Sequence, residues 1–214
     1  MSLVLYFHPL ASYCQKVLIA LYEGGTPFKT ELVDFGNPES TAAFRALWPV
    51  GKMPVLRDIS RDRTLPESSI IIEYLALHYP GPSALIPADP DLALATRLAD
   101  RFYDLYVHDP MQRIVGDRLR PADKKDPYGV ELAEAGLRKS YDMIDADMAG
   151  RTWAAGDAFT LADCAAAPPL FFASRLVPFG ERHNLAAYFR RLSRRPSVAR
   201  TFNEAEPFLK YFPA

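Results

Sequence analysis

Residues 51–56 read GKMPVL, and after a polar turn residues 64–75 read TLPESSIIIEYL. In the first segment Pro54 precedes a short apolar run, which predicts an X-Pro step entering a β-strand. In the second, the acid–hydroxyl pair Glu67-Ser68 opens an apolar helical pattern. A helix start offers free backbone N–H groups and the positive end of the helix dipole, so it can hold an anion. Together the segments predict a site for one small peptide, with a carboxylate at the helix start and a backbone pairing beside the proline.

The chain around these segments alternates strand and helix signals. Apolar and β-branched runs predict strands over residues 3–7, 28–33, 55–58 and 64–65. Helical spacing predicts helices over residues 12–21, 38–47 and 70–78. Gly24-Gly25 ends the first helix, because glycine accepts the left-handed conformation that follows a helix. The order strand–helix–strand, then strand–strand–helix, predicts a thioredoxin-like domain.

From residue 92 onward the signals are helical only. The predicted helices cover residues 92–119, 130–148, 161–176, 185–193 and 197–204. Interior prolines predict a kink at Pro110 in the first of them and a bend at Pro168-Pro169 in the apolar, central third one. The fold class is therefore α/β plus all-α. A thioredoxin-like domain over residues 1–80 is followed by a linker over 81–91 and an all-helical domain over 92–214.

Composition limits the classes of function. The 214 residues carry a net charge of −1, which gives no general attraction to nucleic acid or to anionic membranes. Two cysteines and four histidines without ligand spacing argue against a disulfide scaffold or a metal site. No leader opens the chain and no apolar run could span a bilayer, so we expect a cytoplasmic protein.

A third motif lies at the start of the apolar helix over 161–176. Thr160-Leu161-Ala162-Asp163 predicts a capping box with Asp in place of Glu, a structural feature. With this box, the G-K-M-P step and the Glu67-Ser68 pair, the chain resembles the cytosolic glutathione transferases over nearly its whole length. The resemblance implies a homodimer that attacks small hydrophobic electrophiles with the glutathione thiolate, or reduces organic hydroperoxides, in detoxification.

The resemblance also implies how glutathione, the co-substrate, is held. Pro54 would be cis, so that the backbone of Met53 pairs with the cysteinyl unit. Glu67 and Ser68 would hold the γ-glutamyl group, and Lys52 would reach the glycyl carboxylate. A solvated surface lysine is the alternative for Lys52.

Activation of the thiol is where the chain departs from the family pattern. A cysteine-type thiol has a pKa near ~8.5, so the site must stabilise the thiolate at neutral pH. A helix start and a hydroxyl donor together lower such a pKa. The residue that usually supplies the donor lies five positions before the Lys or Arg of a K/R-V pair. Counting back from Lys16 gives Ala11, which has no donor.

Four residues of the segment YFHPLASYCQKV, residues 6–17, remain as candidates. Ser12 is the first choice, although Ser12 and Gln15 also match a capping box. Tyr6 ends the first strand, as the catalytic tyrosine does in the tyrosine-type classes, but could simply pack there. Cys14 could form a mixed disulfide or be a buried helix residue. Tyr13 could reach the cleft from the helix start.

The acceptor pocket has only a weak signature. Tyr103, Tyr106 and Met111 are candidates on the helix expected to face the cleft. The aromatic residues Phe208, Tyr211 and Phe212 could form a C-terminal lid. Two alternatives to the transferase remain open. One is a non-catalytic regulator of the stringent-starvation type, favoured by Ala11. The other is a glutathione-dependent thiol reductase, disfavoured because Ala11 stands where such enzymes carry their first cysteine.

Overall fold

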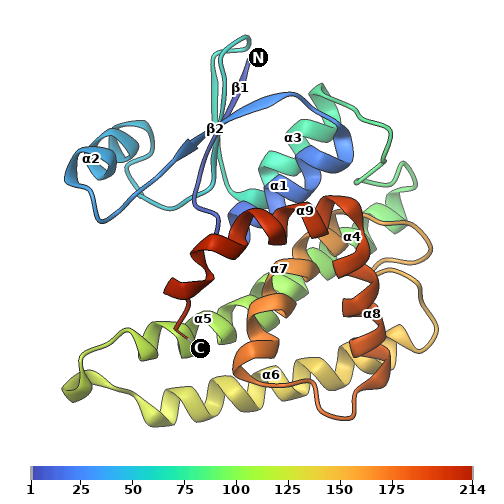
Figure 1. Ribbon diagram of the computed structural model, residues 1–214. Coiled ribbons are helices and arrows are strands. Elements are labelled where there is room, and N and C mark those ends of the chain that lie inside the picture. Colours follow the sequence, from blue (N-terminus) through green and yellow to red (C-terminus); the bar gives the residue numbers. More distant parts are fainter. Residues whose placement is uncertain (1, 214) are drawn as a thin grey trace.

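The computed structural model describes residues 2–213, so residues 1 and 214, at the ends of the two predicted domains, lie outside the described part. The N-terminal half is built on a four-stranded sheet (Figure 1). Its strands are β1 (Leu3–Phe7), β2 (Phe28–Leu32), β3 (Val55–Asp58) and β4 (Arg63–Pro66). They lie in the order β2-β1-β3-β4, with β1 parallel to β2 and β3 antiparallel to both of its neighbours. The predicted thioredoxin-like sheet is confirmed.

Three helices cover this sheet, with α1 and α3 on one side and α2 on the other (Figure 1). Their bounds are α1 (Ser12–Gly24), α2 (Pro38–Leu47) and α3 (Ser68–His78). Successive side chains of a strand point to opposite faces. In β1, Leu3 and Leu5 accordingly share a core with α1 and α3, whereas Tyr6 joins a smaller cluster with Phe44 of α2. Gly25 ends α1 in the left-handed conformation (φ 60°), as predicted.

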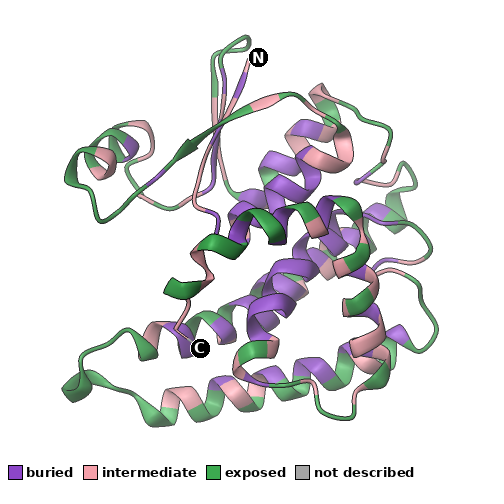
Figure 2. Ribbon diagram, viewed as in Figure 1, coloured by how far each residue is buried: buried purple, intermediate pink, exposed green. Residues whose placement is uncertain are grey.

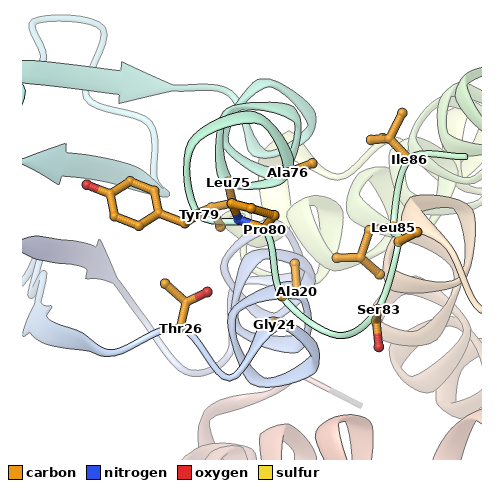
Figure 3. A pocket seen from close by; sticks show the side chains of 12 residues that line it. Ala20, Gly24, Thr26, Leu75, Ala76, Tyr79, Pro80, Ser83, Leu85 and Ile86 are labelled. Atoms are coloured by element: carbon orange, nitrogen blue, oxygen red, sulfur yellow. The ribbon is translucent and has the colours of Figure 1, made fainter. Parts of the chain in front are cut away.

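The connection over residues 79–89 ties the two halves together. A crevice of about 180 Å³ lies between this connection, α1 and α3 (Figure 3). Gly81 packs so tightly on Gly24 that a Cβ at Gly81 would lie 2.4 Å from the Gly24 Cα.

An ion pair also joins the two halves. The Glu23 carboxylate accepts two hydrogen bonds of 2.7 Å from the Arg195 guanidinium near the other end of the chain. One hydrophobic core runs from α1 into the C-terminal helices, so the domain boundaries stay a prediction.

The C-terminal half is helical throughout its regular structure in the described residues. Its α-helices are α4 (Pro90–Phe102), α5 (Asp109–Arg118), α6 (Pro127–Met148), α7 (Leu161–Leu176), α8 (His183–Arg194) and α9 (Pro196–Ala205). A π-helical segment, η1 (Tyr103–His108), joins α4 to α5, and two 3-10 segments are η2 (Ala122–Lys124) and η3 (Glu206–Tyr211).

The π segment takes the place of the kink predicted at Pro110. The chain stays helical from Pro90 to Arg118, but widens over the six residues before α5. Pro110 has no N–H and would clash with the carbonyl four residues earlier, that of Tyr106, in a regular α-helix. The Tyr106 carbonyl instead accepts a 2.8 Å hydrogen bond from the Ser140 hydroxyl of α6. The partner on α6 satisfies a group that the proline leaves without one.

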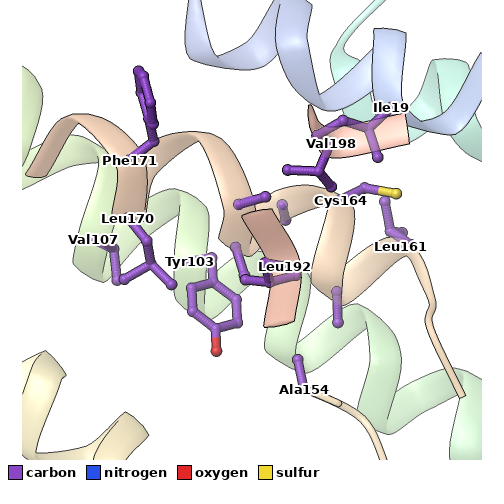
Figure 4. Packing of buried hydrophobic residues seen from close by; sticks show 14 of the residues in the cluster. Ile19, Tyr103, Val107, Ala154, Leu161, Cys164, Leu170, Phe171, Leu192 and Val198 are labelled. Atoms are coloured by element: carbon purple, nitrogen blue, oxygen red, sulfur yellow. The ribbon is translucent and has the colours of Figure 1, made fainter. Parts of the chain in front are cut away.

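Helix α7 is the buried centre of this half, as predicted, and Figure 2 shows it buried along most of its length. It continues through Pro168-Pro169 to Leu176. Cys164 lies among Ile19 of α1 and Val198 of α9 (Figure 4). The expected capping box is present at its start. Because α7 contacts α1 as well as α4 and α8, it fixes the first helix of the sheet domain against the helical half.

Candidate functional site

The start of α3 has unpaired polar groups. Glu67 is the residue before the helix, adopts a positive φ of 69°, and makes no side-chain capping hydrogen bond. Ser68 is the first helical residue and is buried. Its hydroxyl makes no hydrogen bond to any residue between 2 and 213. The orphan N–H groups of the first helical turn therefore remain available to a ligand.

A second unpaired segment lies directly beside it. The peptide bond between Met53 and Pro54 is cis, which confirms the expectation for this step. The pairing of β1 with β3 begins only at Val55. Within the described residues, neither the N–H nor the carbonyl of Met53 finds a backbone partner. An extended peptide could thus pair with Met53 through main-chain hydrogen bonds.

These two segments face one cavity of about 200 Å³. All five residues that the sequence singled out for glutathione line it, and these are Lys52, Met53, Pro54, Glu67 and Ser68. The remaining lining residues are Tyr13 from α1, Arg101 from α4 and Asp104 from the π segment. A helix start, a free strand-like backbone and charges of both signs therefore meet at one place.

A buried charge cluster forms the wall on the α4 side. Lys16 of α1 lies with its Nζ 2.5 Å from Asp100 Oδ1 and 2.9 Å from Asp104 Oδ2. The same Nζ contacts the Ser69 hydroxyl at 2.9 Å, and Arg101 bridges both carboxylates at the cavity edge. Burial raises the pKa of Asp104, and Lys16 opposes this rise. Two cations and two carboxylates balance each other, as buried charges require.

Sequence reasoning missed this cluster. Asp100, Arg101 and Asp104 stand at spacings that place them near one another on a helix, and this was the available signal. Their partner Lys16 is 88 residues away from Asp104 in the chain. Only the tertiary fold brings the long Lys16 side chain of α1 to these carboxylates.

Ser12 does not have the surroundings expected for it. Ala11, not Ser12, is the residue before α1, and it provides no side-chain cap. The predicted Ser12–Gln15 capping box is wrong, since the Gln15 Nε2 donates to the Pro9 carbonyl at 2.8 Å. Ser12 itself is buried, and it is not among the residues that line the cavity.

Tyr6 and Cys14 also lie away from the cavity. The Tyr6 ring packs near Phe44, with ring centroids 6.3 Å apart, in the small cluster under α2. Cys14 is fully buried, and burial raises the pKa of its thiol to about 12. A thiol with this pKa is not a nucleophile at neutral pH, so the position suits the buried helix cysteine considered above.

Tyr13 is the one of the four candidates found at the cavity wall. Its ring lies against His108, with centroids 4.1 Å apart and planes tilted by 42°. Burial lowers the pKa of His108 to about 4, with Lys16 adding to the effect, so the imidazole is neutral at pH 7. The π segment and α1 thus hold a phenol and a neutral imidazole together beside the cavity.

The three acceptor-pocket candidates lie outside this cavity. Tyr103 and Met111 are buried in the core. Tyr106 is exposed in a separate groove of about 710 Å³ between α4, the π segment and α6. Of the aromatic residues near the C-terminus, Phe208 lies edge-on to His8 of the β1–α1 loop, at 5.5 Å between ring centroids. Phe212 lies 4.9 Å from Phe172 of α7 by the same measure.

Comparison with known proteins identifies the family of this chain. The family model described as "Glutathione S-transferase, N-terminal domain" matches residues 5–83, and the corresponding C-terminal domain model matches residues 102–196. This chain belongs to the glutathione S-transferase family.

The chain is similar to proteins with different names. Glutathione S-transferase GstB of Escherichia coli is 28% identical over 86% of this chain and 89% of its own length. A stringent starvation protein A homolog of Haemophilus ducreyi is 31% identical over 83% of this chain and 73% of its own. The crystal structure of a glutathione S-transferase from Methylobacillus flagellatus with glutathione bound superposes with a TM-score of 0.84. That match has 26% identity and covers 94% of this chain and 98% of the other.

The described residues of this family member contain no group of three or more His, Cys, Asp or Glu side chains suited to a metal ion. Nor does any helix within residues 2–213 have the length and apolar character needed to cross a membrane.

Proposed function

We propose that this protein binds reduced glutathione in the cavity between α1, α3 and α4 and transfers its thiolate to small hydrophobic electrophiles. One observation carries the proposal. Residues from two separate segments, Lys52 to Pro54 and Glu67-Ser68, line the same cavity, and both the N–H groups of the first α3 turn and the Met53 backbone groups lack a partner within residues 2–213. A purely structural helix start of this kind would be capped or covered, because unpaired buried N–H groups are costly.

The charges of the cavity match those of the tripeptide. The γ-glutamyl carboxylate accepts hydrogen bonds from the first turn of α3 and from the Ser68 hydroxyl. The γ-glutamyl ammonium group faces the carboxylates of Glu67 and Asp104. The cysteinyl backbone pairs with Met53, and the Lys52 ammonium reaches the glycyl carboxylate. Each charged group of the ligand then has a counter-charge or a helix dipole.

Bound in this way, the sulfur points toward the start of α1. That helix start has no side-chain cap, so its N–H groups and dipole stabilise a thiolate. Ser12 and Tyr13 are the hydroxyl candidates of its first turn. The thiolate forms a bond to an electrophilic carbon while the leaving group departs with its electron pair. Reduction of an organic hydroperoxide is the other reaction open to the same nucleophile.

The proposed functional unit is a homodimer, in which the protein pairs with a second copy of itself. The groove between α4, the π segment and α6 is lined by exposed apolar side chains, among them Leu98, Tyr106 and Met143. Apolar surface gathered in this way is typical of an interface. We place the homodimer in the cytoplasm with a detoxifying role, and two free, buried thiols are consistent with a reducing compartment.

A second candidate function is a non-catalytic regulator of the stringent-starvation type. It is favoured by the similarity to the protein of Haemophilus ducreyi and by Ala11 in the usual activating position. A thiol reductase is disfavoured, since Cys14 is fully buried and no cysteine precedes it.

Two measurements separate these functions. Calorimetric titration of the protein with reduced glutathione tests the site, and cysteinylglycine, which lacks the γ-glutamyl group, is the control ligand. We expect glutathione to bind clearly more tightly. Equal affinity would contradict the placement at Glu67 and Ser68. Turnover of a nitro-activated aryl halide then distinguishes the transferase from a regulator that binds glutathione without using it.

A further inference from the structure

Of the two hydroxyl-bearing residues in the first turn of α1, Tyr13 lines the cavity. Ser12, one position earlier, is rotated by about 100° around the helix and does not line the cavity. We propose that the Tyr13 hydroxyl donates a hydrogen bond to the thiolate of bound glutathione and replaces the donor that Ala11 lacks. This inference rests on the proposed function and names the residue that activates the thiol there.

The Tyr13 hydroxyl is free to act on a ligand. Within residues 2–213 it makes no hydrogen bond, although the side chain is half-buried. Its ring packs against the His108 ring, with centroids 4.1 Å apart, and the Lys16 ammonium lies 5.9 Å from its centroid. A fixed ring with an unpaired hydroxyl is the preorganised donor that stabilises a developing anion.

The charges around Tyr13 keep its hydroxyl protonated. Burial raises the pKa of Tyr13, and the carboxylates of Asp104, Asp109 and Glu67 raise it further, against the opposing effect of Arg101. Of the other groups that face the ring, Lys16 is paired with carboxylates and His108 is neutral at pH 7. The phenol is therefore a donor throughout the pH range in which a glutathione thiol ionises.

Tyr13 lies on the wall of the cavity where the cysteinyl sulfur of bound glutathione is expected. Met53 offers its backbone on one wall and Ser68 its hydroxyl on another, while Tyr13 closes the side toward α1. A cysteinyl unit paired with Met53 directs its side chain at this third wall. The thiol proton leaves to solvent, Tyr13 keeps its own proton and shares it in the hydrogen bond, and the sulfur retains the electron pair that attacks the electrophile.

The test is the pH dependence of thiolate absorbance in the complex with glutathione. Tyr13→Phe should raise the apparent pKa of the bound thiol by about one to two pH units. At pH 7, kcat/KM should fall roughly ten- to a hundredfold. Affinity for glutathione below the thiol pKa should stay within about twofold, because the variant keeps every group assigned to the peptide. Ser12→Ala should leave the thiol pKa nearly unchanged, as should Tyr128→Phe, a matched change at an exposed tyrosine of α6.

A second substitution guards against misfolding of Tyr13→Phe. Replacing Tyr13 by 3,5-difluorotyrosine keeps the hydroxyl and nearly the same shape but makes it a stronger donor, so the thiol pKa should fall. The inference is overturned if glutathione binds and neither change at position 13 moves the thiol pKa, or if Ser12→Ala moves it more. Loss of glutathione binding in Tyr13→Phe would assign Tyr13 to binding and overturn it too. A wild-type protein that does not bind glutathione overturns the proposed function itself.

Discussion

The starts of α7 and α3 solve the same problem in opposite ways. At α7 the Thr160 hydroxyl accepts from the Ala162 N–H at 3.3 Å, and the Asp163 carboxylate accepts from the Thr160 N–H at 2.9 Å. At α3 the residue in the equivalent position, Glu67, has a positive φ and makes no capping bond. Both helix starts have the same orphan N–H groups, but only one satisfies them from within the chain.

The difference separates a structural motif from the proposed binding site. The α7 start is buried, and Asp163 also accepts hydrogen bonds from Tyr188 (2.7 Å) and from the Ala154 N–H (2.9 Å). The α3 start opens onto a cavity whose other walls are charged or unpaired. Under the proposed function, a ligand supplies the partners that the uncapped N–H groups of α3 lack. The same motif type, an acid and a hydroxyl near a helix start, thus has two meanings that only the surroundings separate.

The largest effect is expected at the α7 start. Asp163→Ala removes one acceptor from three buried donors, those of Thr160, Ala154 and Tyr188, and leaves them unpaired. We expect the free energy of unfolding to fall by about 3–5 kcal/mol, since each buried unsatisfied group costs about 1–3 kcal/mol. Chemical denaturation measures this loss. Asp163→Asn, which keeps an acceptor, should lose less. A loss below about 1 kcal/mol in Asp163→Ala would show that the carboxylate does not hold this region together.

The second-largest effect is the pH dependence of stability that arises from His108, beside the cavity. Folded His108 beside the cavity has a pKa of about 4, whereas the unfolded chain has the ordinary value near ~6.5. Between these values the unfolded state binds more protons, so this residue makes the protein less stable as the pH falls from 6.5 to 4. The contribution is about 3 kcal/mol over that range.

The matched variant is His108→Phe, which keeps a ring against Tyr13 but cannot titrate. Its unfolding free energy should depend less on pH than that of the wild type between pH 6.5 and 4, measured by denaturation at several pH values. If the unfolding free energies of the two proteins changed with pH in the same way, the pKa of His108 would not be lowered by folding. Water would then reach the imidazole in the folded protein.

Local signals in the sequence predicted much of this fold. Helix α2 begins and ends at the predicted residues because its own chain supplies the cap, with the Asn37 side chain accepting from the N–H groups of Glu39 and Ser40. The capping box at Thr160 is local in the same way. The cis bond at Pro54 was expected from the family resemblance, which rests on short motifs such as the G-K-M-P step and the Glu67-Ser68 pair, and both motifs meet at one cavity.

What the sequence left open depends on distant residues. The π segment at Tyr103–His108 needs a hydroxyl from Ser140 of another helix, and the charge cluster needs Lys16 to meet α4 and the π segment. Whether Ser12 or Tyr13 faces the cavity depends on where α1 begins. A one-residue change in that start turns each side chain by about 100°, which no residue pattern of the loop specifies.

The α3 start should respond to mutation in binding and not in stability. Ser68→Ala removes a hydroxyl that the protein itself does not use, so the free energy of unfolding should change by less than about 0.5 kcal/mol. Binding of glutathione should weaken by about 1.5–3 kcal/mol, the usual worth of a hydrogen bond to a charged group. Calorimetry measures the binding, with Ser193→Ala on α8 as a control that changes a serine far from the cavity. Unchanged affinity would remove Ser68 from the γ-glutamyl site.

The smallest expected effect completes the comparison at α7. Thr160→Ala removes the hydroxyl that caps the Ala162 N–H, while Asp163 still accepts from the Thr160 N–H. Loss of such a cap lowers the free energy of unfolding by about 1 kcal/mol, and Thr160→Ser should restore most of it. Glutathione affinity should stay the same in both variants, because α7 contributes no residue to the cavity. Ser68→Ala and Thr160→Ala should therefore give opposite patterns, the first weakening only binding and the second only folding. If Ser68→Ala destabilised the protein as much as Thr160→Ala does, the α3 start would be a structural cap after all, and its role as a ligand site would have to be abandoned.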